Sequence, residues 1–219
     1  MSQAVSRTDV FFPRSWWNVW IRWTSATAVG ELIGFAIPAV LLPLALVIGL
    51  SEDLLPLAAI VAGAGEGASL GFAQWIVLQR HLPQITRRAW IGATTLGAMF
   101  AYAVAMIPTS LVDFEKLDRA ILITGGSIIG LLFLLSMGLP QALVLRQQLK
   151  HSGWWVLASA VAWPLGVAVP FIGLTAIPDG SPVIVIVGTG VLCGMLMGVV
   201  VGAVTGAAFV WLVQMNTRK

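Results

Sequence analysis

The chain has 219 residues, of which 58% are hydrophobic and 10% are charged, and its mean hydropathy is +0.94. A soluble domain carries about 25% charged residues, so the composition excludes that class. The net charge of +3 is too small to indicate nucleic-acid binding. The single cysteine, Cys193, excludes an internal disulfide and a cysteine-based metal site.

The apolar residues form six runs, and each is long enough to cross a bilayer as a helix, which needs about 20 residues. A transmembrane β-barrel would instead alternate apolar and polar residues in short strands, and that pattern is absent from the sequence. No apolar leader with a small-residue cleavage site precedes the first run, so we expect no signal peptide. We therefore predict an all-α membrane protein whose spans cover residues 24–50, 54–78, 89–111, 120–145, 153–177 and 182–213.

Residues 1–23, which are rich in tryptophan, precede the first span. We predict that residues 11–23 form a short helix on the cytoplasmic membrane surface, either as an anchor or as a docking surface for a partner. The transmembrane domain would then occupy residues 24–214, followed by a short cytoplasmic tail at 215–219. Indole prefers the headgroup zone of a bilayer. Accordingly, we expect a set of tryptophans at span ends to be interface anchors: Trp16, Trp17, Trp20, Trp23, Trp90, Trp154 and Trp155.

The charges separate by side of the predicted membrane. Ten of the twelve basic residues precede odd-numbered spans or follow even-numbered ones, and only Lys116 and Arg119 lie on the opposite side. Basic residues in short loops concentrate on the cytoplasmic side. The distribution therefore predicts that the N and C termini are both cytoplasmic.

The spans also repeat in pairs. Trp23, Trp90 and Trp155 align at spacings of 67 and 65 residues, and Gly71, Gly138 and Gly206 align at 67 and 68. Fixed-period similarity of this kind indicates repeated structural units. We predict three parallel two-helix repeats, at about 23–80, 90–147 and 154–214, arranged as a pseudo-threefold bundle.

Glycines recur at every fourth residue in the second and sixth spans. Small residues allow helix backbones to approach closely in lipid, where leucine and lipid tails are equally apolar. These stripes are therefore expected to pack helices together, with a pore lining or a dimer seam as the alternatives. The glycines concerned are Gly63, Gly67, Gly71, Gly194, Gly198, Gly202 and Gly206.

Two carboxylates, Glu31 and Glu66, lie within the first and second spans. An ionised acid there costs about 2.5–3.5 kcal/mol. At 1.5 Å of rise per residue both fall in the middle-to-cytoplasmic part of adjacent helices, where their side chains can approach each other. We expect a neutral, hydrogen-bonded pair, a proton or cation site, or a contact with a partner subunit. Gln74 and Gln141 are expected to form cross-helix hydrogen bonds.

Enzymatic chemistry is not indicated. The sequence has no HExxH, GxSxG or Walker-type motif, and His81 and His151 fall in predicted loops, where we expect them to be solvated. We predict a protein without catalytic residues, metal ligands or a cofactor.

The segments QWIVLQRHLP, QALVLRQQL and GWWVLASAVAWPLG resemble the repeated QWLVLRR…GWW motifs of an uncharacterised group of small bacterial polytopic membrane proteins. The resemblance covers the second to fifth spans best. The second copy of the motif differs from this pattern at Ala142, where tryptophan is expected. The resemblance implies a multi-span repeat architecture and the bacterial cytoplasmic (inner) membrane, and it carries over no activity.

Two functions follow from these features. With small loops and no soluble domain, the protein is expected to be a non-enzymatic accessory or scaffolding subunit of a larger membrane complex. The alternative is a small transporter or channel that uses Glu31 and Glu66 as a proton or cation site. Its expected partners are the lipid bilayer and either another membrane protein or further copies of itself, with no nucleic acid.

Overall fold

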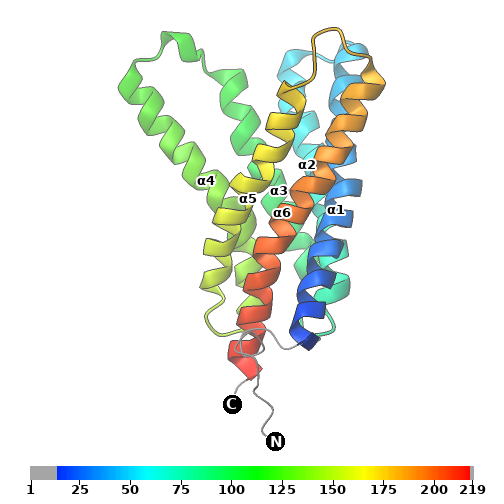
Figure 1. Cartoon of the computed structure of the whole chain (residues 1–219). Helices are drawn as coiled ribbons and strands as arrows, with labels where there is room; N and C mark the ends of the chain where they lie inside the picture. The colour runs from blue at the N-terminus through cyan, green and yellow to red at the C-terminus, as the bar shows by residue number, and fades with distance from the viewer. Residues whose placement is uncertain (1–13, 218–219) are drawn as a thin grey trace, which may run out of the picture.

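The structure, a computed structural model, describes residues 14–217, with side chains from Trp16 onward. It consists of long helices joined by short loops, and residues 14–217 contain no strand (Figure 1). Six helices are long and apolar enough to cross a membrane, which confirms the predicted all-α, multi-pass class. They are α1 (Arg14–Val47), α2 (Leu55–Leu78), α3 (Arg87–Leu111), α4 (Arg119–Leu145), α5 (Gly153–Thr175) and α6 (Val183–Thr217).

The predicted surface helix at 11–23 is wrong for the part that the structure describes. From Arg14 onward these residues are the first turns of α1, and Trp20 Nε1 donates a hydrogen bond to the Ala203 carbonyl of α6 at 2.8 Å. This segment therefore packs on α6, because α1 continues through it as one unbroken helix. The expected tail at 215–219 is likewise helical up to Thr217, where α6 ends. Residues 1–13, 218 and 219 lie outside the described part.

The start of α1 and the end of α6 lie at the same end of the bundle (Figure 1). The α2–α3 and α4–α5 loops also lie there, so we call it the basic end after Arg22, Arg80, Arg87, Arg88, Arg146 and Lys150. The opposite end is called the acidic end after Glu52, Asp53, Asp113, Glu115, Asp118 and Asp179. Asp118 also caps α4 by accepting hydrogen bonds from the backbone N–H groups of Ala120 and Ile121.

Each helix packs on the next along the chain, and α6 packs on α1, which closes a ring of six helices. Small residues determine two of these contacts. A methyl group built on Gly67 would lie 2.8 Å from the Cα atom of Thr95 in α3, and one on Gly202 would lie 2.9 Å from the Cα atom of Thr24 in α1. All seven glycines of the predicted stripes lie against a neighbouring helix: Gly63, Gly67 and Gly71 on α3, and Gly194, Gly198, Gly202 and Gly206 on α1.

A layer of aromatic side chains fills the bundle at the basic end. Trp23, Trp90 and Trp155 have no exposed surface, and their ring centroids lie 5.7 to 6.2 Å apart, edge to face. The prediction that these three are interface anchors is therefore wrong. The helix faces that carry them turn toward the axis of the bundle, so the three rings point inward. We call these three residues the tryptophan triad. By contrast, Trp17 and Trp154 are about half exposed on the outside, as an anchor would be.

Polar side chains support the tryptophan triad. Gln141 Nε2 donates to Thr94 Oγ1 at 3.0 Å, and Trp155 Nε1 donates to Gln141 Oε1 at 2.9 Å. Gln74 Nε2 donates to Thr27 Oγ1 at 3.3 Å. Both glutamines thus form cross-helix hydrogen bonds, which hold the basic end together where no water is available to replace them.

The acidic end is more open. The buried residues of α4 run only from Ser136 to Leu145, so the first two thirds of the helix lie outside the tightly packed part of the bundle. In Figure 1, α3 and α4 lean away from α5 toward this end. The ring is therefore closed at the basic end and widens toward the acidic end.

Candidate functional site

The two acids meet where α1, α2 and α6 pack together. Glu31 has no exposed surface and Glu66 is 6% exposed. Glycines create the room for both: a methyl group on Gly198 would lie 2.7 Å from Glu31 Cβ, and one on Gly34 would lie 3.2 Å from Glu66 Cγ. Because Gly34 lies one turn after Glu31 on α1, its contact with Glu66 places the two acids beside each other.

The carboxyl group of Glu31 has no donor. Neither of its oxygens accepts a hydrogen bond from any group in the part of the chain that the structure describes. Two ionised carboxylates cannot bond to each other because neither has a proton to donate. A proton held between Glu31 and Glu66 would supply the missing donor, and it would also remove one of two negative charges from a buried site.

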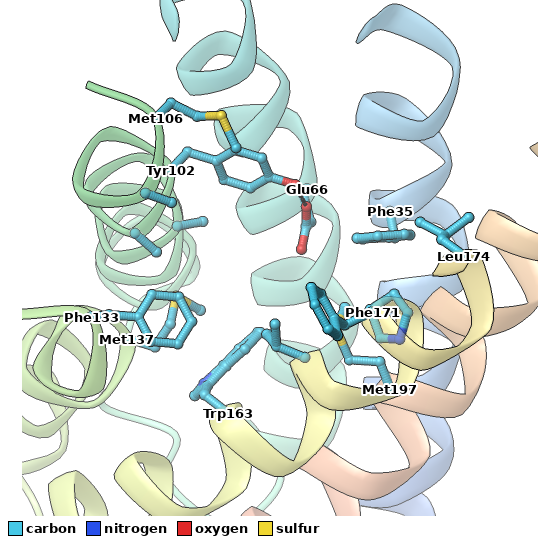
Figure 2. Close-up of a pocket in the computed structure, with 15 residues that line it drawn as sticks. Phe35, Glu66, Tyr102, Met106, Phe133, Met137, Trp163, Phe171, Leu174 and Met197 are labelled. Atoms are coloured by element: carbon cyan, nitrogen blue, oxygen red, sulfur yellow. Dashed lines mark hydrogen bonds between the residues drawn. The ribbon is translucent and has the colours of Figure 1, made fainter. Parts of the chain in front are cut away.

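Glu66 has a second polar neighbour. The hydroxyl of Tyr102, on α3, donates a hydrogen bond to Glu66 Oε2 at 2.6 Å (Figure 2). The Tyr102 ring lies against Gly63, one turn before Glu66 on α2, where a side chain would displace it. The missing side chain of Gly63 therefore positions the hydroxyl that holds the Glu66 carboxylate.

A cavity of about 310 Å³ lies in the middle of the bundle, and Glu66 lines it. All six helices contribute to its walls, which are almost entirely apolar and largely aromatic or sulfur-containing (Figure 2). Glu31, which is fully buried, is not among the residues that line the cavity. The lining includes Phe35, Phe133, Met137, Trp163, Phe171 and Met197.

The apolar space continues toward the acidic end. A second cavity, of about 240 Å³, shares Phe35, Tyr102 and Leu174 with the first and extends along α1 and α6 to Pro43 and Ile186. Toward the basic end, a buried cluster that includes Leu70, Ala162 and Val201 closes the space, and the tryptophan triad lies beyond it. The space beside Glu66 is therefore closed toward the basic end.

Sequence reasoning identified Glu31 and Glu66 and their approach, but it missed the cavity and Tyr102. A cavity is what remains when six helices fail to fill a space, so no single segment encodes it. Tyr102 did carry a signal, since it is the only tyrosine in the chain. It lies in a predicted span, where a hydroxyl needs a partner.

The two histidines differ in surroundings. His151 is exposed and adopts a left-handed backbone conformation with φ of 61°. His81 is half-buried between the rings of Trp16 and Phe209, so the expectation that it is simply solvated is wrong. Burial, and then the charges of Arg80 and Arg22, lower the pKa of His81 below 6.5.

The described residues contain no group of three or more His, Cys, Asp or Glu side chains that could hold a metal ion. The acidic loop residue Asp113 pairs with Lys116 at 2.6 Å on the surface. Comparisons with protein-family models, curated proteins and solved structures found no match to this chain. The function is therefore inferred from the geometry of the site.

Proposed function

We propose that the protein is a proton-linked membrane transporter in which Glu31 and Glu66 carry the exchanged proton. One observation carries the proposal: the Glu31 carboxyl is fully buried without a donor, beside a second carboxyl that lines a cavity. Charge at such a depth costs about 2.5–3.5 kcal/mol, and ionisable groups held there despite this cost typically mark proton or ion pathways.

The two acids have different access to the cavity. Glu66 can exchange a proton with whatever enters the cavity, whereas Glu31 can exchange one only through Glu66. The pair is neutral when both acids are protonated. When one proton leaves, the remaining proton bridges the two groups, and the Tyr102 hydroxyl stabilises the negative charge on Glu66. The pair can thus release one proton without leaving an isolated buried charge.

One-sided access suits a carrier better than a channel. The cavity leads toward the acidic end, and the tryptophan triad blocks the basic end. Transport would require the triad to part while the acidic end closes, as in the alternating access of other carriers. We propose that the basic end faces the cytoplasm, because short loops rich in arginine and lysine stay on that side. The membrane is then the bacterial inner membrane that the motif resemblance implies.

The internal repeat belongs to the same proposal. Phe35, Tyr102 and Val167 occupy equivalent positions in the three predicted units, and all three line the central cavity. The members of the tryptophan triad, also equivalent, contact one another pairwise. A pseudo-threefold axis through the cavity and the tryptophan triad accounts for both sets of equivalent residues. The two acids occur in the first unit alone, so the site departs from the symmetry of its scaffold.

Flux measurements test the transport proposal even while the cargo is unidentified. Full-length protein is reconstituted into liposomes that contain a pH-sensitive dye, and inorganic cations, organic cations, weak acids and neutral solutes are added separately. We expect at least one class to move protons in the wild type, with loss of that movement in Glu66→Gln and retention in the surface control Glu115→Gln. Wild-type liposomes that move no protons with any class would overturn the proposal.

An accessory-subunit role is the second candidate, and one feature of α4 favours it. Gly125, Gly126 and Gly130 lie on the open part of α4, where a methyl group on any of them would meet nothing. Gly63 and Gly198, the repeat equivalents of Gly130, both lie against a neighbouring helix. A partner helix would occupy the corresponding place on α4. Native mass spectrometry from the original membrane tests this role, and a partner-free monomer would contradict it.

A further inference from the structure

We infer that the cargo is a lipophilic organic monocation, which binds in the central cavity against Glu66 and displaces one proton from the Glu31–Glu66 pair. This inference rests on the proposed transport function and specifies its substrate class. The observations behind it are the lining of the cavity, the scarcity of oxygen ligands, the charge of the site and its opening to lipid.

The walls of the cavity indicate an organic cargo. Inorganic cations need about six oxygen ligands once their water is removed. The side chains that line this cavity offer the Glu66 carboxylate and the Tyr102 hydroxyl as oxygen ligands, and the remaining side chains are apolar. A volume of about 310 Å³ falls at the lower end of the range for sites of drug-sized molecules. The site therefore fits a molecule whose surface is mainly hydrocarbon.

The charge of the site indicates a cation. No lysine or arginine lines the cavity, so an ionised carboxylate there has no positive partner within the described chain. The aromatic rings of Phe35, Phe133 and Trp163 add the negative faces that attract organic cations. A monocation replaces a proton with no change in net charge. The site is thus neutral with two protons, or with one proton and one bound cation.

The opening of the cavity suits a compound dissolved in the membrane. Phe171 lines the cavity and is also 71% exposed, and Val167, one turn earlier on α5, is 37% exposed. On the opposite side of the opening lies α4, whose residues before Ser136 are not buried. Because lipophilic cations partition into the bilayer, this opening lets them reach Glu66 from the lipid.

Binding of radiolabelled tetraphenylphosphonium to the purified full chain tests the inference. We expect saturable binding with about one site per chain, which strengthens by up to about tenfold per pH unit while a proton is being displaced. In weakly buffered solution, each bound cation should release about one proton. Tetraphenylborate, which has a similar shape and a negative charge, should not compete.

Two sets of variants locate the site. Glu66→Gln should weaken binding by at least about tenfold, whereas the loop control Glu115→Gln should not change it. Phe133→Ala, which leaves both acids intact, should also weaken binding, and Phe72→Ala, on the exposed face of α2, should not. If a variant in one pair folds poorly, the comparison within the other pair can still be interpreted.

Failure of this inference can be distinguished from failure of transport. Absence of tetraphenylphosphonium binding, binding that Glu66→Gln leaves unchanged, or binding without proton release would overturn the inference. If another class of compound still moved protons through Glu66, the transport proposal would survive with a different cargo. If no class moved protons, both would be wrong.

Discussion

The hydroxyl of Tyr102 donates a hydrogen bond to Glu66 Oε2 at 2.6 Å and so joins α3 to α2 at the wall of the central cavity. Tyr102→Phe keeps the ring against Gly63 and removes this bond alone. A hydrogen bond to a charged group contributes about 1.5–3 kcal/mol, so we expect a modest loss of stability and a larger loss of proton-linked flux. Thermal unfolding and liposome flux measure the two effects. Flux equal to that of the wild type would show that Tyr102 does not assist proton release.

Glu31→Gln separates stability from proton exchange. The amide has nearly the shape of the acid and can donate a hydrogen bond to Glu66 without needing a shared proton. We therefore expect unchanged or higher thermal stability, together with loss of proton-linked flux, since functional sites often reduce stability. Exposure of the buried Cys193 to a thiol-reactive fluorophore during heating reports unfolding. A clear loss of stability would instead assign Glu31 a structural role.

Gly198 and Gly130, which the predicted repeats place at equivalent positions, provide a matched test of helix packing. A methyl group on Gly198 would lie 2.7 Å from Ala28 Cα, and backbone cannot move aside cheaply, so Gly198→Ala should destabilise the bundle by about 1–3 kcal/mol. Gly130→Ala places the methyl group in open space and should be neutral or stabilising, because alanine favours helix by about 1 kcal/mol. Equal effects in thermal unfolding would contradict the packing described for α1 and α6.

The third of the predicted repeats lacks one hydrogen bond of the layer beside the tryptophan triad. Phe209 stands where the first two units have Gln74 and Gln141, and the hydroxyl of Ser159 has no partner there. If the repeat is real, Phe209→Gln should be more stable than Phe209→Leu when Ser159 is present. This advantage should vanish in a Ser159→Ala background, with a coupling of about 1 kcal/mol. A coupling near zero would count against the proposed equivalence.

His81 predicts a pH dependence of stability. Its pKa is below 6.5 in the folded chain and close to 6.5 when the chain unfolds, so the unfolded chain binds more protons between these two values. The free energy of unfolding should therefore fall as the pH is lowered through that window and should not change from this source above it. His81→Gln should remove the effect and His151→Asn should keep it, as followed by unfolding in denaturant. A pH profile unchanged in His81→Gln would mean that another group is responsible.

The predicted span limits agree well with the helices in the interior of the chain. Predicted spans at 54–78 and 120–145 correspond to Leu55–Leu78 and Arg119–Leu145. Both lie between polar loops that hydrocarbon cannot accommodate, so composition alone locates their ends. The start of α1 was predicted wrongly because a segment of charged and aromatic residues, as at 14–23, has the same sequence pattern in two cases. It can lie on the membrane surface as a separate helix, or it can extend a membrane-spanning helix.

Composition and spacing alone predict six apolar spans and place two acids within them, because a helix segment that crosses hydrocarbon must be largely apolar. The direction in which each side chain points depends instead on how the six helices pack together. This packing turned Trp23, Trp90 and Trp155 inward, brought Glu31 to Glu66, and left a cavity beside them. The reason is physical: every face of these helices is apolar, so hydrophobicity does not say which face packs, and close contacts at glycine and other small residues decide it.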